Sequence, residues 1–252
     1  MKKCNFKKCR NSISETLTEI FAPTCRCVSC GKDVFDGTAF CAECHKRIVH
    51  NNGKTCKRCG VGIEGEEDYC GNCAFDKIYF DRAYSVFSYE GAVQQAILSM
   101  KFNNLGSYAM VLAKYLVFMA EKVNLSYDLV TYAPMSKLAL RKRRYNQARL
   151  LAKHFCAFRN EDELLVEAVI KIKETEAQEK LNKDERKTNL LGAYKFNSDV
   201  NVKGKRVLVI DDVKTTGATL NECAKILKDA GAVAVYAITV ASRKEHFDYE
   251  TE

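Results

Sequence analysis

The sequence contains no apolar run long enough to form a signal peptide or a membrane-spanning helix. The N-terminus is basic and lacks an apolar core, and the most hydrophobic later stretch, YAMVLAKYLVFMA, is interrupted by Lys114. We therefore expect a cytoplasmic protein that is not inserted into a membrane. An apolar fraction of 47% excludes a disordered chain, and 252 residues are enough for one large domain and a smaller one.

Cysteine, in contrast, is abundant, with 13 residues. A reducing compartment does not favour a disulfide framework, so metal binding is the better explanation. Four CxxC pairs precede residue 74, and ten residues separate the two pairs in each half, which gives an internal repeat of 29 residues. The paired residues are Cys27, Cys30, Cys41, Cys44, Cys56, Cys59, Cys70 and Cys73.

Each CxxC pair places two thiolates on one tight turn, and two such turns supply the four sulfur ligands of a tetrahedral zinc ion. Eight ligands predict two ions. Packing of apolar cysteines does not explain matched spacing, and a four-cysteine site leaves no open position for catalysis. Sequential pairing of the turns is favoured, although a crossed arrangement uses the same residues. The other five cysteines are predicted not to bind metal, namely Cys4, Cys9, Cys25, Cys156 and Cys223.

From about Phe80 the sequence alternates between strand and helix patterns. This alternation predicts an α/β fold with a parallel sheet, helices on both faces and a ligand site beyond the carboxyl ends of the strands. The predicted domains are an extension at 1–24, a double zinc ribbon at 25–76 and the α/β domain at 80–245. We expect strands within 81–89, 127–134, 168–173, 192–196, 206–213 and 233–242, and helices near 92–102, 108–123, 146–158 and 217–230.

The stretch VLVIDDVKTTGATL, from Val207 to Leu220, predicts a buried strand, a short loop and a helix N-terminus. Hydroxyls of the loop threonines and backbone N–H groups at that N-terminus would form a phosphate cradle, with Gly217 allowing close approach. The two aspartates that end the strand can accept hydrogen bonds from vicinal hydroxyls. The pattern therefore fits a ribose 5-phosphate, whereas an N-cap or an exposed turn is the structural alternative.

This stretch resembles the phosphoribosyl pyrophosphate (PRPP) motif of type I phosphoribosyltransferases. Residues 133–152 (APMSKLALRKRRYNQARLLA), residues 177–196 (AQEKLNKDERKTNLLGAYKF) and the eight-cysteine module extend the resemblance to the ComF family, also called ComFC, from about Cys25 to Arg243. The resemblance implies a double zinc ribbon followed by a phosphoribosyltransferase domain. It also implies a role in handling incoming single-stranded DNA during natural transformation.

The resemblance assigns roles to particular residues. Asp211 and Asp212 would be the catalytic pair and would bind the ribose hydroxyls of PRPP, directly or through Mg²⁺. The segment 174–189 would close over the site as a lid, and a surface helix or loop is the alternative. The 5-phosphate would lie on Thr215, Thr216, Gly217, Ala218 and Thr219, and Val213 and Lys214 would also belong to the PRPP site. The pyrophosphate would lie on Pro134, Met135, Ser136 and Lys137, after the first parallel strand.

One departure leaves the enzymatic activity open. Some purine-salvage members carry an acidic residue where this chain has Thr215, and threonine does not titrate near neutral pH, so it cannot serve as that general base. The pocket could bind PRPP without turnover, or it could serve an acceptor that is already nucleophilic, such as ammonia.

Between Leu129 and Asn160 the chain has eight Lys or Arg residues and no acidic one. Basic residues beside an aromatic ring are typical of single-strand binding, because the cations contact phosphates and the ring stacks on a base. A solvated helix face or a pyrophosphate site is the alternative. Asn146 and Gln147 have no assigned role. The predicted nucleic-acid contacts are Arg141, Lys142, Arg143, Arg144 and Tyr145.

Three functions follow from these predictions. The leading one is a DNA-uptake protein with two structural zinc ions and a PRPP pocket, whose partners are single-stranded DNA and competence proteins such as a helicase or DNA-processing factors. The second is an active phosphoribosyltransferase of nucleotide metabolism, and the third is a nucleic-acid adaptor with a vestigial pocket. Only the second requires turnover of PRPP.

Overall fold

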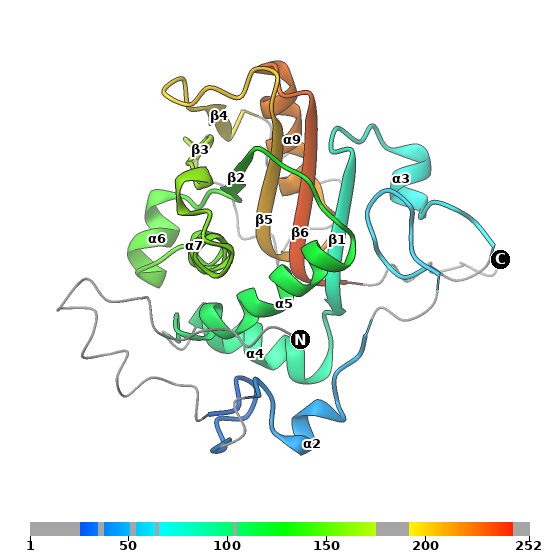
Figure 1. Ribbon diagram of the computed structural model, residues 1–252, viewed down its shortest axis with the longest axis vertical. Helices are drawn as coiled ribbons and strands as arrows, with labels where there is room; N and C mark the ends of the chain where they lie inside the picture. Colours follow the sequence, from blue (N-terminus) through cyan, green and yellow to red (C-terminus); the bar gives the residue numbers. More distant parts are fainter. Residues whose placement is uncertain are drawn as a thin grey trace.

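The computed structural model describes residues 26–34, 38–50, 54–63, 66–102, 105–174 and 192–243. Its centre is a four-stranded, wholly parallel sheet in the order β1-β6-β5-β2 (Figure 1). The predicted parallel α/β architecture is confirmed. The sheet strands are β1 (Arg82–Ser88), β2 (Leu129–Tyr132), β5 (Arg206–Lys214) and β6 (Ala234–Ser242).

The central strand β5 is buried on both faces, as its continuous apolar run predicts. Leu208 and Ile210 pack into one hydrophobic core, and Val207 and Val209 pack into a second one on the other face. The first core also contains buried residues of α4 (Gly91–Phe102), α5 (Tyr108–Lys122) and α7 (Gln147–Arg159). The second contains those of α9 (Ala218–Asp229).

Two predicted strands lie outside the main sheet. β3 (Val169–Lys171) and β4 (Tyr194–Phe196) pair with each other in an antiparallel ladder and pack into the α9 core. The strand before the predicted pyrophosphate loop, Leu129–Tyr132, is the second parallel strand in chain order and not the first as predicted, because Arg82–Ser88 belongs to the same sheet. The described part of the domain also contains two short helices, α6 (Lys137–Arg143) and the 3-10 helix η2 (Asp162–Leu164). Residues 1–25, with Cys4, Cys9 and Cys25, lie outside the described residues. Residues 175–191, which include 175–189 of the predicted lid, also lie outside them.

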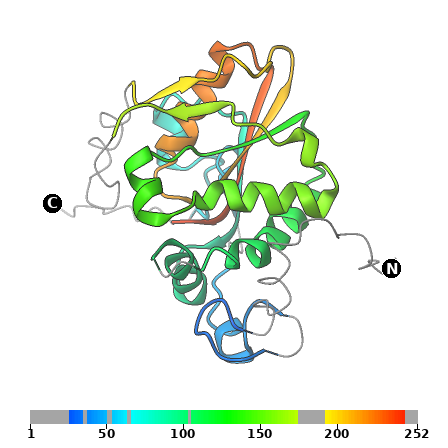
Figure 2. The ribbon, with the colours of Figure 1, turned by 90° about the vertical axis from the view of Figure 1, so that its left-hand side faces the viewer.

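The two cysteine modules are joined to the α/β domain through its two cores. The first module, which contains α2 (Ala42–His45), shares a core with α4 and α5 and lies beside α4 in both ribbon views (Figures 1 and 2). Its Phe40 ring lies 6.5 Å from Phe87 of β1, measured between ring centroids. The second module, which contains α3 (Gly71–Phe75), shares the α9 core. Each module therefore extends one face of the sheet.

The modules also cover the outer edge of β1. The N–H of Ala83 donates to the carbonyl of Arg58 (2.7 Å), and the N–H of Ser88 donates to that of Val49 (2.9 Å). His50 forms an antiparallel bridge with Phe87. An exposed strand edge invites pairing with other chains, so these contacts protect the sheet at its N-terminal strand.

The turn glycines of the two modules differ in how closely they approach this strand. Gly31 and Gly60 follow equivalent CxxC pairs and have φ of +74° and +68°. A Cβ at Gly60 would lie 2.7 Å from the Ala83 carbonyl oxygen, whereas a Cβ at Gly31 would meet nothing within 4 Å. Only Gly60 is in contact with the domain.

Gly60→Ala is therefore expected to destabilise the protein more than Gly31→Ala. Gly31→Ala should cost about 1 kcal/mol from the positive φ alone, while Gly60→Ala should cost roughly 2–4 kcal/mol because the clash is added. Urea unfolding measures both changes, and Gly31→Ala is the matched control. Equal losses in the two variants would show that the Gly60 turn does not hold the edge of β1.

Candidate functional site

The eight paired cysteines form two groups, and the pairing is sequential. Cys27, Cys30, Cys41 and Cys44 make one group, and Cys56, Cys59, Cys70 and Cys73 make the other, with all sulfur atoms of a group within 4.8 Å of one another. The Sγ atoms of Cys30 and Cys41 are 3.7 Å apart, and those of Cys59 and Cys70 are 3.6 Å apart. Tetrahedral zinc with sulfur ligands at about 2.3 Å requires a sulfur separation of about 3.8 Å. Both groups fit structural zinc.

Hydrogen bonds to sulfur support these sites. The N–H of Cys59 donates to Cys56 Sγ (3.5 Å), and Arg47 Nη2 donates to Cys44 Sγ (3.0 Å), which favours the thiolate that a metal requires. The second group is wholly buried, whereas Cys30 of the first is exposed. Cys156 and Cys223 lie outside both groups, and burial raises the pKa of Cys156 to about 12.

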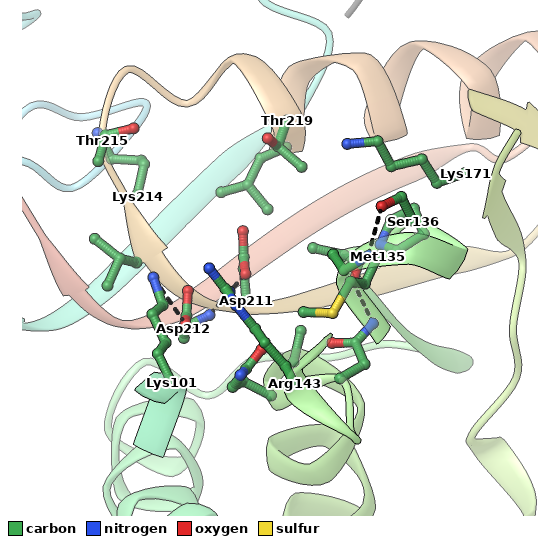
Figure 3. Close-up of a pocket in the computed structure, with 18 of the residues that line it drawn as sticks. Lys101, Met135, Ser136, Arg143, Lys171, Asp211, Asp212, Lys214, Thr215 and Thr219 are labelled. Atoms are coloured by element: carbon green, nitrogen blue, oxygen red, sulfur yellow. Dashed lines mark hydrogen bonds and ion pairs between the residues drawn. The ribbon is translucent and has the colours of Figure 1, made fainter. Parts of the chain in front are cut away.

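A pocket of about 600 Å³ opens beyond the carboxyl ends of β2 and β5 (Figure 3). This volume is typical of a small-molecule site. Most of the residues predicted to bind PRPP line this pocket, but Lys137 and Thr216 do not. Those that line it are Pro134, Met135, Ser136, Asp211, Asp212, Val213, Lys214, Thr215, Gly217, Ala218 and Thr219.

The loop after β5 has the geometry of an anion cradle. Gly217 caps α9 with φ +80°, a left-handed conformation that glycine adopts without strain. The first turn of α9 contains no acidic residue, so no carboxylate of the helix itself competes with an anion for its backbone N–H groups. Thr215 and Thr219 add hydroxyls to the lining, while Thr216 Oγ1 accepts from the N–H of Ala218 (3.4 Å).

The acidic pair at the end of β5 is largely enclosed. The N–H of Asp212 donates to Asp211 Oδ1 (2.8 Å), and the Asp212 side chain is 10% exposed. Burial raises the pKa of Asp211 to about 8, and the neighbouring charge of Asp212 adds to the shift. A cation or the hydrogen-bond donors of a ligand would therefore stabilise the charged form of this pair.

Lys101, which sequence analysis missed, faces this pair from α4. Its Nζ lies 3.1 Å from Asp212 Oδ2, and the side chain is 14% exposed (Figure 3). Burial alone would lower the pKa of Lys101, but the charge of Asp212 outweighs it and the pKa is raised. No motif surrounds Lys101, since it lies in an amphipathic helix far upstream of the aspartates.

The loop after β2 is fixed by hydrogen bonds. Ser136 caps α6 by accepting from the N–H of Ala139 (3.2 Å), and Glu174 accepts from the N–H of Leu138 (3.0 Å). A hydrogen bond from Ser136, followed by that backbone N–H, lowers the pKa of Glu174. Lys137 is exposed and is not among the residues that line the pocket.

Two further lining residues carry polar groups with no predicted role. Gln147, the first residue of α7, is 2% exposed, and its amide nitrogen has no hydrogen-bond partner among the described residues. Lys171 lies on β3 with its Nζ 5.5 Å from the Tyr194 ring centroid, and burial lowers the pKa of Lys171. Only the position of Gln147 at a helix start, after the Asn146 cap, signals it in the sequence.

The basic run lies partly in the lining of the pocket and partly on the surface of the protein. α6 has no buried residue, and Arg141, Lys142 and Arg144 are exposed. Lys142 and Arg143 line the pocket, and the Arg143 guanidinium carbon lies 5.1 Å from the centroid of the exposed Phe102 ring.

Tyr145 is half-buried. Its hydroxyl donates to the carbonyl of Met100 in α4, and its ring packs beside Gly106. The ring is thereby held against α4, next to the basic run and outside the pocket lining.

Comparison with known proteins agrees with both parts of this architecture. A double zinc ribbon domain matches residues 16–74, and a phosphoribosyl transferase domain matches residues 148–248. Competence protein F of Haemophilus influenzae is 28% identical over 213 residues, which cover 82% of this chain and 92% of that protein. DNA utilization protein YhgH of Escherichia coli is 26% identical, with 77% and 86% covered. Competence protein ComFC of Bacillus subtilis is 27% identical, with 77% and 80% covered.

Fold and site define a protein that joins a double zinc ribbon to a phosphoribosyltransferase domain. The two domain matches and these relatives confirm the predicted resemblance to the ComF/ComFC family. Among the described residues, no helix is long and apolar enough to cross a membrane.

Proposed function

We propose that the chain binds PRPP in this pocket and handles single-stranded DNA in the uptake or use of DNA. One observation carries the proposal. The same pocket is lined by the acidic pair and phosphate loop after β5 and by Lys142 and Arg143 of the basic run. A sugar-phosphate site and a polyanion-binding surface therefore adjoin each other.

The chemistry of the lining suggests how PRPP would lie. Its 5-phosphate would accept hydrogen bonds from the N-terminus of α9 and from Thr215 and Thr219. The ribose hydroxyls would face Asp211 and Asp212. The pyrophosphate, with the Mg²⁺ that it carries in solution, would lie on residues 134–136, within reach of Lys171 and the free amide of Gln147.

Phosphoribosyl transfer is the second candidate function, and one observation favours it. Lys171 lines the pocket and has a lowered pKa because of burial, so it is a candidate proton acceptor where Thr215 cannot serve. Pyrophosphate release from PRPP, tested with nucleobases, ammonia and single-stranded DNA, distinguishes turnover from binding alone. Release with one acceptor that disappears in Lys171→Met would establish the enzyme.

DNA binding is tested by replacing Arg141, Lys142, Arg143 and Arg144 with Gln. Binding to single strands that depends on phosphate contacts falls log-linearly with salt. Each lost contact makes the negative slope of log K against log salt less steep by about 0.7, so the slope should change by roughly 3 if all four residues contact phosphates. Fluorescence anisotropy with a labelled oligonucleotide at several salt concentrations measures the slope.

A matched control removes four positive charges elsewhere, by replacing Lys195, Lys203, Lys205 and Lys225 with Gln. It should keep the wild-type slope if the basic run makes the contacts. Tyr145→Ala should weaken binding by about 1–3 kcal/mol with little change in slope if its ring stacks on a base. A wild-type slope in the Arg141–Arg144 variant would leave the basic run as a solvated face or a pyrophosphate site.

A further inference from the structure

The acidic pair does not fit a bound divalent cation. Mg²⁺ requires near-octahedral coordination by oxygen at about 2.1 Å. Here Lys101 Nζ lies 3.1 Å from Asp212 Oδ2, and Asp211 Oδ1 accepts the N–H of Asp212. Each carboxylate therefore already has a partner, and a positive charge already stands where a metal would bind.

Lys101 is held in this position by the fold. It lies in the last turn of α4, next to Met100, which is fully buried in the core, and the carbonyl of Met100 accepts the Tyr145 hydroxyl. A metal ion on Asp212 would have to displace the ammonium group and leave it enclosed without its carboxylate. Such a buried unpaired charge is strongly unfavourable.

We propose that Lys101 is a built-in cation that takes the place of a divalent metal at the Asp211–Asp212 pair. The pocket then binds the ribose 5-phosphate part of its ligand without a metal ion on these carboxylates. A carboxylate has about four lone-pair positions, so Asp212 can accept a ribose hydroxyl while it holds Lys101. This inference rests on the proposed sugar-phosphate site and specifies how its charge is balanced.

The role of Lys101 is tested with ribose 5-phosphate as the probe, because this sugar phosphate lacks the pyrophosphate that carries Mg²⁺ in PRPP. Titration calorimetry compares its affinity in buffer free of divalent cations, prepared without a chelator so that the zinc sites stay filled, and in excess Mg²⁺. For the wild type the two affinities should agree within about twofold. In Lys101→Met the affinity without Mg²⁺ should fall about tenfold or more, because the carboxylates repel each other and the phosphate, and Mg²⁺ should restore part of it.

Direct binding of Mn²⁺, followed by electron paramagnetic resonance without any sugar, gives a second readout. The wild type should show no Mn²⁺ site that depends on Asp212, whereas Lys101→Met should gain one, and Lys101→Met/Asp212→Asn should lose it again. Lys101→Arg keeps the charge and should behave as the wild type. Lys228→Met, which breaks an ion pair with Asp81 away from the pocket, is the matched control and should gain no site.

The outcomes separate the two proposals. Ribose 5-phosphate binding by the wild type that requires Mg²⁺, or a wild-type Mn²⁺ site lost in Asp212→Asn, overturns the role of Lys101. If neither wild type nor variant binds ribose 5-phosphate, the sugar-phosphate function fails, and the Mn²⁺ comparison still decides whether Lys101 excludes a metal.

Discussion

Replacing both Asp211 and Asp212 with Asn is expected to abolish measurable binding of PRPP. The substitution keeps the size of the side chains but removes the negative charge that accepts the ribose hydroxyls. Hydrogen bonds to charged groups contribute about 1.5–3 kcal/mol each, so two of them account for at least two orders of magnitude in affinity. Titration calorimetry with PRPP measures the loss.

The controls must separate this effect from misfolding. Asp212→Asn leaves Lys101 enclosed without its partner, so the double variant is also made with Lys101→Met and compared by thermal unfolding. Asp128→Asn is the matched carboxylate control. Asp128 pairs with Arg206 at the opposite end of β5 (2.7 Å), and that hydrogen bond lowers the pKa of Asp128 to about 2. PRPP affinity unchanged in a folded double variant would place the ligand elsewhere.

Loss of zinc from the second cysteine group is expected to unfold far more than the ribbon. All four of its cysteines are buried and share a core with α9 and with Val207 and Val209 of β5. A structural zinc site contributes roughly 10–16 kcal/mol of apparent binding energy, which matches or exceeds the whole stability of a typical domain. Cys59→Ser should therefore remove one zinc ion per chain and the cooperative thermal transition.

Metal analysis and circular dichroism measure these two changes. Cys156→Ala is the matched control, because Cys156 is equally buried but lies outside both groups. It should keep two zinc ions and a cooperative transition. A Cys59→Ser protein that lacks one zinc ion yet melts as the wild type would show that the ribbon is energetically independent of the α/β domain.

Sequence analysis succeeds where the chemistry is local. The CxxC turns and the strand, loop and helix of 207–220 need no distant residue to be recognised, and the parallel sheet follows from the alternation of long elements. It fails where tertiary packing decides. Lys101 and Lys171 reach the pocket only because α4 and β3 fold against it. The three-residue strands β3 and β4 carry too little pattern to indicate that they pair with each other.

The independence of the ribbon from the α/β domain could not be judged from the sequence either. A dense run of cysteines followed by a change in composition predicts a separate domain. Phe40 packs against Phe87 of β1 and Tyr115 of α5, and Val28 belongs to the same core, so this core extends beyond the cysteine module. Composition reports that such residues are buried and gives no indication of what covers them.

The position of β1 in the sheet has a consequence for synthesis on the ribosome. β1 comes before the other sheet strands in the chain, yet its only neighbour in the described sheet is β6, which comes last, with Arg82 opposite Tyr236. During translation β1 must wait unpaired until the C-terminal strand emerges, and unpaired strands are prone to aggregate. The cysteine modules precede β1, so they can take up zinc and shield its outer edge before its partner exists. Supply of metal to the nascent chain should thus affect the yield of soluble protein more than metal added after synthesis.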